Sequence, residues 1–167
     1  LLLAGHDTTM SLISTGIWLL LAHPDAAALV RDDPTAAPGA VEEILRFMGP
    51  LQVASGGGRW PVEPVEVRGV TLEPGVPVRL LLGSANRDPA AFADPDCFDI
   101  TRTPNRHLGF GKGLHFCVGA ALGRLEGQIV LPRVLRRFPQ LALVDPEPTW
   151  RPTFVTRQLA TLPVTTA

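Results

Sequence analysis

The sequence of 167 residues has almost no excess charge, since 15 basic and 16 acidic residues give a formal net charge of -1. This balance provides no uniform field for binding nucleic acid, and it excludes an acidic or basic disordered tail. Only two cysteines are present, which excludes a disulfide-rich secreted scaffold and indicates a reducing, cytoplasmic location. Function must therefore come from particular sites in the chain.

The sequence also lacks a membrane span and a signal peptide. Its apolar opening is interrupted by polar residues, whereas a span needs roughly 20 apolar residues, and no basic region precedes it. The chain starts without an initiator Met and without the start or cap of a helix, so the first element is expected to extend upstream. We therefore interpret residues 1–167 as a fragment of a larger domain.

Apolar periodicity predicts a mainly helical chain. Helices are expected over residues 1–22, 24–30, 38–47 and 118–138. Pro132 is expected to kink the last helix or to end it early. The first helix is apolar on most sides and therefore predicted to be buried, which would place Asp7 and Thr8 deep in the protein.

Small antiparallel sheets are expected between these helices. Alternation of apolar and polar residues predicts a hairpin over 65–72 and a further strand over 76–82. The tail after Leu141 alternates like two short strands. Residues 86–116 show little periodicity and contain much Pro, Gly, Asp and Asn, and a loop of this length is usually functional.

The densest chemical signal is LGFGKGLHFCVGAALGRLE at 108–126. Its glycines let the backbone approach a flat or bulky ligand. Cys117 falls at the start of a predicted helix, where amide dipoles lower the pKa of a thiol and favour the thiolate, the form that ligates a metal. A phosphate-binding loop is excluded because Lys112 is followed by Gly113, where Ser or Thr is required.

Three other interpretations of this loop remain open on the residues alone. Cys117 could be a structural cysteine beside a glycine-rich turn. It could be a nucleophile, although no base or orienting group stands in fixed relation to it. A zinc site could draw on four residues whose spacing does not form the usual knuckles, namely Cys97, His107, His115 and Cys117.

The ten residues FGKGLHFCVG at 110–119 fit the pattern F-G-x-G-x-H-x-C-x-G, which resembles the heme-binding loop of bacterial cytochrome P-450 monooxygenases. The resemblance implies heme b as cofactor, with Cys117 as the axial iron ligand. It further implies that His115 donates to a heme propionate and that Phe110 packs near the sulfur. Gly111 and Gly119 complete the cofactor-binding pattern.

The segment from Ala4 to Thr9, AGHDTT, resembles the oxygen-binding segment of the long central helix in that family. The resemblance implies that Ala4 and Gly5 border the cofactor where the helix loosens to admit dioxygen. Thr8 would hydrogen-bond the bound oxygen, and Asp7 would relay protons from solvent. Without the cysteine loop, the same segment would be interpreted as a helix with a polar stripe.

Glu43 and Arg46 resemble the buried E-x-x-R pair that clamps the meander before the cysteine loop in this family. A third member usually comes from an Arg in a P-E-R-F-like motif. Here that motif is PDCF at 95–98, with Cys97 in the Arg position, and Cys97 is expected to be a small packed residue. His107 and Arg102 are therefore the candidates for the third member.

Two further matches come from the middle of the chain. Arg59 stands before the predicted hairpin, as the propionate-binding Arg does in the family, and its fork suits a carboxylate. The run ANRDP at 85–89 matches a run common in the bacterial branch, where Arg87 and Asp88 are expected to support the turn.

The order of these matches implies the C-terminal part of the cytochrome P-450 fold, mainly α with small antiparallel β-sheets, over residues 1–167. The implied function is a heme-thiolate monooxygenase that activates dioxygen and inserts one oxygen atom into a small organic substrate. A ferredoxin-type electron donor with its reductase would dock near Cys117, where Arg side chains and Lys112 supply positive charge. Neither nucleic acid nor a membrane is an expected partner. The alternative is a catalytically silent, truncated heme-binding fragment.

Overall fold

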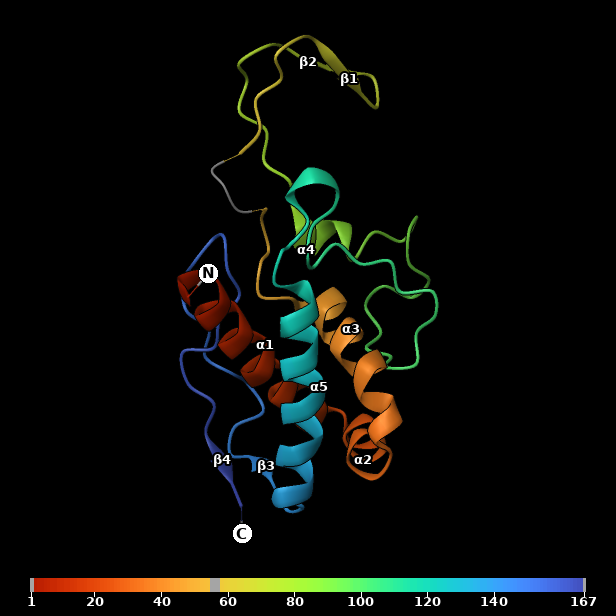
Figure 1. Cartoon of the computed structure of the whole chain (residues 1–167), viewed down its shortest axis with the longest axis vertical. Helices are drawn as coiled ribbons and strands as arrows, with labels where there is room; N and C mark the ends of the chain where they lie inside the picture. The colour runs from red at the N-terminus through yellow and green to blue at the C-terminus, as the bar shows by residue number, and fades with distance from the viewer. Residues whose placement is uncertain (1, 55–57, 167) are drawn as a thin grey trace.

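The computed structural model describes residues 2–54 and 58–166, and its body is a group of packed helices (Figure 1). The longer helices are α1 (Leu2–Ala22), α2 (Pro24–Asp32), α3 (Ala37–Met48) and α5 (Ala120–Arg137). Short helical turns occur at η1 (Pro34–Ala36), α4 (Leu82–Ala85) and η2 (Gly113–His115). Figure 1 shows α5 running along α1 and α3, with the starts of α1 and α5 towards the same end of this body.

Proline and a side-chain cap explain where the first helices end and begin. Pro24 stands in the first turn of α2, where its missing N–H costs nothing. The carboxylate of Asp33 then accepts the backbone N–H of Thr35 at 2.8 Å and caps η1.

No single helix of the described chain is long and apolar enough to cross a membrane. Helices α1 and α2 together reach that length and composition, but they are bent by 114° relative to each other.

The apolar core lies where α1, α3 and α5 meet. Gly16 of α1 allows the close approach, because a Cβ there would lie 3.0 Å from Ile44 Cδ1 and 3.1 Å from Leu131 Cδ2. Removing such apolar surface from water is the main force that holds the helices together. The central buried side chains are Leu12, Leu19, Leu20, Val41, Ile44, Leu45, Leu131 and Leu135.

The sheets are small and antiparallel. Strands β1 (Val65–Val67) and β2 (Val70–Leu72) form a hairpin with Val67 opposite Val70. The two turn residues, Arg68 and Gly69, have φ angles of 48° and 77°, as the two-residue hairpin turn requires. Strands β3 (Ala142–Leu143) and β4 (Val164–Thr165) pair near the end of α5. The prediction of a mainly helical chain with small antiparallel sheets is confirmed.

One prediction about secondary structure is wrong. Residues 76–82 form no continuous strand: they contribute isolated bridges, Arg59 with Val78 and Val53 with Leu81, before α4 begins at Leu82. Pro77 lacks the N–H that a continuous ladder requires. The predicted extent of the last helix is confirmed: of the two alternatives for Pro132, an early end does not occur, and α5 continues to Arg137. The burial of Leu131 and Leu135 offsets the cost of proline in the helix.

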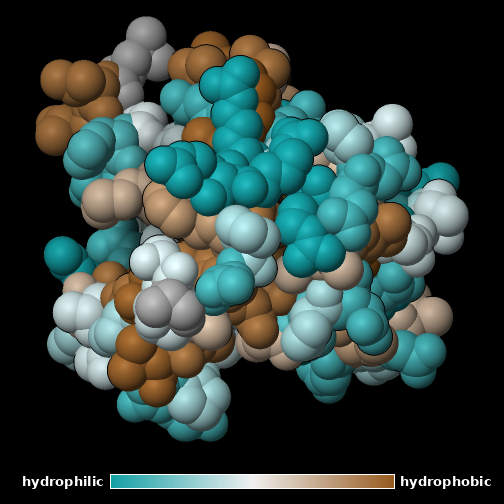
Figure 2. Space-filling model, turned by 90° about the horizontal axis from the view of Figure 1, so that it is seen from below, coloured by the Kyte–Doolittle hydropathy of each residue, from teal (hydrophilic) through white to brown (hydrophobic). Residues whose placement is uncertain are grey.

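The end of the molecule opposite the hairpin is mostly hydrophilic. Seen from below, its apolar residues form separate patches between polar side chains (Figure 2). Residues 86–119, by contrast, have little regular structure apart from η2, and they lead from α4 to the start of α5. This irregular segment carries most of the residues predicted to be functional.

Candidate functional site

The Cys117 loop is closed by its own backbone. The N–H of Cys117 donates to the carbonyl of Phe110 at 2.9 Å, and the N–H of Phe116 donates to Gly113 at 3.0 Å. Gly111 and Gly113 have φ angles of 73° and 74°, a region that glycine adopts without strain. The loop therefore presents Cys117 directly before α5, whose N-cap residue is Gly119.

The thiol of Cys117 is free, and the residue is exposed. Its apolar neighbours Leu114, Phe116 and Val118 are exposed as well, Leu114 completely. A Cβ at Gly119 would lie 3.9 Å from the Cys117 sulfur, which is an ordinary contact distance. An accessible sulfur within an apolar surface suits a flat, apolar ligand that carries a metal.

His115 and Phe110 both precede Cys117 within this loop. His115 ends η2 and is exposed. The Phe110 ring lies 6.5 Å from the Phe116 ring, centroid to centroid, and the Arg124 guanidinium lies 4.6 Å from the centroid of the Phe110 ring. Phe110 thus contacts the later residues of the loop through both its ring and its backbone carbonyl.

The start of α1 differs from what the sequence predicts. Ala4, Gly5 and Asp7 are exposed, and Thr8 is half-buried. The prediction that Asp7 and Thr8 lie deep in the protein is therefore wrong for the described residues, because no described segment covers this end of α1. The helix is also continuous here, with the Thr8 hydroxyl donating to the carbonyl of Ala4 at 2.6 Å.

Arg59 lies on the extended segment that leads to the hairpin. Its backbone pairs with Val78 in both directions, at 2.9 and 2.7 Å. Its guanidinium donates to the carbonyl of Gly58 at 2.9 Å, and the residue is half-buried. One Nη1 bond to a neighbouring carbonyl leaves further N–H groups on the fork for a carboxylate.

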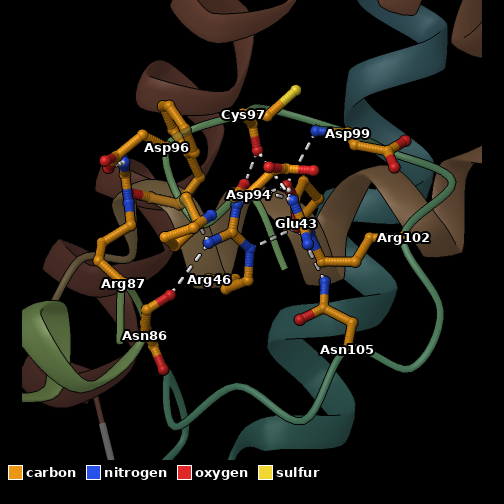
Figure 3. A network of polar contacts seen from close by, with 12 residues as sticks. Glu43, Arg46, Asn86, Arg87, Asp94, Asp96, Cys97, Asp99, Arg102 and Asn105 are labelled. Carbon is orange, nitrogen blue, oxygen red and sulfur yellow. Dashed lines mark hydrogen bonds and ion pairs between the residues drawn. The ribbon is translucent and has the colours of Figure 1, made fainter. Parts of the chain in front are cut away.

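Arg46 is the centre of a buried polar network (Figure 3). Its side chain is 0% exposed, and it uses all five N–H groups of the guanidinium. Two of them bind Glu43, at 2.7 and 2.8 Å. The other three bind backbone carbonyls of the irregular segment, those of Asn86, Pro95 and Cys97. Arg46 therefore attaches this segment to α3.

The same segment also donates hydrogen bonds to the Glu43 carboxylate. Its carboxylate accepts the Nε of Arg102 at 3.3 Å, the Nδ2 of Asn105 at 3.0 Å and the backbone N–H of Asp99 at 2.9 Å. Of the two residues expected as the third member of the clamp, Arg102 binds Glu43. His107 does not, because its Nε2 lies 2.9 Å from Glu42 instead.

Cys97 is exposed, so the prediction that it is a packed residue is wrong. Its backbone carbonyl accepts both Arg46 at 2.9 Å and Arg102 at 3.1 Å, while its sulfur points away from them in Figure 3. The clamp uses the main chain at this position, so Arg102, five residues later, supplies the positive charge.

The ANRDP run binds the start of the irregular segment to Leu108 and to the end of α3. Asn86 is buried, and its Oδ1 accepts the N–H of Leu108 at 2.7 Å. Arg87 donates to the carbonyl of Phe47 and binds Asp96 at 2.6 Å. These bonds bring the start of the Cys117 loop and the end of α3 to the same place.

Glu42, which the sequence analysis did not identify, joins three parts of the site. It binds Arg124 of α5 through both oxygens, at 2.6 and 2.9 Å, and His107 at 2.9 Å. Burial alone would raise the pKa of Glu42, but the hydrogen bonds from His107 and Arg124 and the charge of Arg124 outweigh it and lower the pKa from 4.5 to about 2. No local sequence pattern reveals Glu42, since Arg124 is 82 residues away in the sequence.

Acid is expected to weaken the fold through Glu42. A carboxyl whose pKa is lower in the folded chain stabilises it above the unfolded value, about 4.5, and this contribution is lost as the pH falls towards about 2. Urea unfolding midpoints measured across this window should fall more steeply for the unchanged chain than for Glu42→Gln. Parallel pH profiles for the two proteins would contradict this expectation.

Among the described residues, no group of three or more His, Cys, Asp or Glu side chains is arranged to hold a metal ion. The four residues considered for zinc, Cys97, His107, His115 and Cys117, accordingly form no such cluster. His107 is instead bound to Glu42 and to the backbone of Gly109.

Most of the chain matches the model of a known protein family. Residues 35–163 match the family model described as Cytochrome P450. The chain belongs to the cytochrome P450 family. Among curated relatives, it is 48% identical over 165 residues to a biotin biosynthesis cytochrome P450 of Bacillus subtilis. It is also 48% identical over 166 residues to the cytochrome P450 monooxygenase PikC of Streptomyces venezuelae.

These alignments cover 99% and 98% of this chain but only 41% and 39% of the two relatives. Solved P450 structures agree with them. The structure of P450BioI in complex with an acyl carrier protein carrying hexadec-9Z-enoic acid has a TM-score of 0.92 and 48% identity, covering 97% of this chain and 41% of that one. The Bacillus subtilis P450 PksS has a TM-score of 0.93 and 38% identity, covering 99% and 43%. The chain thus spans about two fifths of the P450 proteins it resembles.

Proposed function

We propose that this chain carries the heme-thiolate centre of a P450 monooxygenase, with Cys117 as the axial ligand of a heme b iron. The observation that supports this is the free, exposed Cys117 thiol at the start of α5, on a loop closed by its own backbone. A cysteine sulfur is an established ligand of heme iron, which it binds as the thiolate.

The residues around the thiol fit a heme. Leu114, Phe116 and Val118 supply apolar surface beside the sulfur, as a macrocycle requires. His115 is exposed and Arg59 has unused N–H groups, so both are available for the propionates. When bound, the heme supplies an iron whose thiolate ligand favours cleavage of the O–O bond.

The proposed catalytic roles are proton relay for Asp7 and hydrogen bonding to dioxygen for Thr8. Thr8 has one hydroxyl hydrogen, and it is donated to Ala4. To donate to dioxygen, the Thr8 hydroxyl would have to leave the Ala4 carbonyl and rotate, whereas its oxygen can accept a hydrogen bond without this change. Asp7 is exposed, so its carboxylate can exchange protons with solvent. Ala4 and Gly5 would border the cofactor beside them.

We propose a small organic substrate and dioxygen as reactants, as the relatives named as monooxygenases and hydroxylases suggest. Electrons would come from a ferredoxin-type donor and its reductase, which would dock near Cys117, where exposed Lys112 supplies positive charge. Two free, exposed cysteines fit the reducing conditions of the cytoplasm.

The second candidate is a catalytically silent, truncated heme-binding fragment. It is favoured by the exposure of Leu2 and Leu3 beside the proposed oxygen-binding segment, and of Leu122 and Leu125 on α5. Loading the chain with hemin and then assaying substrate oxidation separates the two candidates. Stoichiometric, thiolate-ligated heme together with substrate oxidation supports the monooxygenase, whereas heme binding without turnover supports the silent fragment.

Replacing Cys117 with serine is expected to abolish the carbon-monoxide difference spectrum typical of thiolate ligation, because a serine oxygen cannot replace the thiolate. Cys97→Ser is the matched control, since Cys97 is also exposed but contributes only its carbonyl to the clamp. The spectrum should persist in that variant. Persistence of the spectrum in Cys117→Ser would overturn the assignment of the ligand.

A further inference from the structure

Glu42, His107 and Arg124 form a second cluster, separate from the Glu43–Arg46 network. Arg124 meets the Glu42 carboxylate with its Nε and one Nη, the bidentate geometry that gives the strongest ion pairs. His107 approaches the same carboxylate at 2.9 Å, and its side chain is only 3% exposed. The cluster thus joins α3, α5 and the segment before the Cys117 loop.

Both ring nitrogens of His107 are used. The backbone N–H of Gly109 donates to Nδ1 at 3.0 Å, so Nδ1 must be unprotonated, and Nε2 carries the hydrogen donated to Glu42. A Cβ at Gly109 would lie 3.0 Å from this Nδ1 and 3.1 Å from the carbonyl of Leu45. Gly109 therefore packs tightly between His107 and α3.

Arg124 holds the other side of the loop. Its guanidinium lies 4.6 Å from the centroid of the Phe110 ring, within the range of a cation–π contact. Phe110 is also the residue whose carbonyl accepts the Cys117 N–H. The path from Glu42 to Cys117 consists of two side chains and one backbone hydrogen bond.

We propose that Glu42, His107 and Arg124 are positioning residues that hold the Cys117 loop against α3 and α5, so that Cys117 stands ready to bind its ligand. The Glu43–Arg46 clamp holds the preceding segment, whereas this cluster acts on Gly109 and Phe110 inside the loop. For its heme readout the inference rests on the proposed function, but its first test does not require heme.

The first test is hydrogen–deuterium exchange of the heme-free chain. In Glu42→Gln a neutral side-chain amide replaces the carboxylate, so the ion pair with Arg124 is lost. The backbone N–H groups of residues 108–117 should then exchange at least about fivefold faster. Amides of 11–20 in α1 should be unchanged. Glu126→Gln is the matched control, because Glu126 is a half-buried carboxylate on α5 that makes no ionic contact with the described part of the chain.

Unchanged exchange at 108–117 in Glu42→Gln would overturn the proposal. If that variant also exchanges faster in α1, it has lost its fold, and Arg124→Gln and Arg124→Lys then decide. Loop exchange should be faster in Arg124→Gln and should return towards the original rate in Arg124→Lys, which restores the charge but not the two-point contact. Equal rates in these two variants and the unchanged chain would also overturn the proposal.

The second test uses the heme-loaded chain. Glu42→Gln should bind heme but lose a measurable share of the thiolate signature in the carbon-monoxide difference spectrum, and Glu126→Gln should keep it. If the unchanged chain shows no such signature, the proposed heme function fails while the exchange result still decides the positioning role. A full signature in Glu42→Gln together with unchanged exchange refutes that role alone.

Discussion

Replacing Arg46 with methionine is expected to lower the free energy of unfolding by about 3–5 kcal/mol, because it breaks a buried ion pair and leaves Glu43 with an uncompensated charge. Both side chains are 0% exposed, so water cannot compensate. The substitution also removes the N–H groups that bind the carbonyls of Asn86 and Pro95, and one of the two that bind the carbonyl of Cys97. Arg102 remains on Glu43, but at 3.3 Å and through one nitrogen.

The measurement is the urea midpoint, followed by circular dichroism. Arg31→Gln is the control: Arg31 forms an exposed ion pair with Asp32 at 2.8 Å, and its loss should leave the midpoint nearly unchanged. Arg46→Lys should recover only part of the loss, since an ammonium has three N–H groups instead of five. A midpoint for Arg46→Met as high as that of Arg31→Gln would show that the network contributes little.

Adding one methyl group at Gly39 is expected to destabilise the chain by about 1–3 kcal/mol through overpacking. A Cβ at this position of α3 would overlap the backbone carbonyl oxygen of Ile100. That carbonyl cannot rotate away, because Ile100 is buried in the core cluster and the neighbouring segment is tied to Glu43. Relief therefore requires a shift of the backbone of the irregular segment or of α3.

Gly5→Ala is the same chemical change in another helix and should have the opposite sign. A Cβ at Gly5 meets nothing within 4 Å, so alanine should stabilise α1 by up to about 1 kcal/mol through its higher helix propensity. Urea midpoints of the two variants, compared with the unchanged chain, test both expectations. A Gly39→Ala midpoint equal to or above that of the unchanged chain would contradict the close contact with Ile100.

Local chemistry was enough to predict most helices, and tertiary packing explains the errors. Apolar spacing and Pro24 located the first two helices, because periodicity and the special backbone of proline act within a few residues. Pro132 left open from the sequence whether α5 ends early, because the burial of Leu131 and Leu135, which supports the helix beyond it, is revealed by no short window. The alternation at 76–82 resembled a strand, but a strand also needs a continuous partner.

In the candidate site, too, contacts between residues close in sequence could be predicted, whereas contacts between distant residues could not. Glu43 and Arg46 could be paired from sequence because they are three residues apart on one helix. Their partners Arg102 and Asn105 are 59 and 62 residues from Glu43, and only the folded chain brings them together. Glu42 shows the limit most clearly: it adjoins a recognised residue, yet its contacts lie on α5 and before the Cys117 loop.

The five bonds of Arg46 have a consequence for how the molecule opens. Residues 86–97 have little regular structure, and three of their carbonyls are bound to this one guanidinium. A helix can fray one turn at a time, but a segment whose carbonyls are bound mainly to two guanidinium groups, those of Arg46 and Arg102, has few such intermediate steps. It is expected to open as one cooperative unit, so amides across it should share one protection factor against exchange.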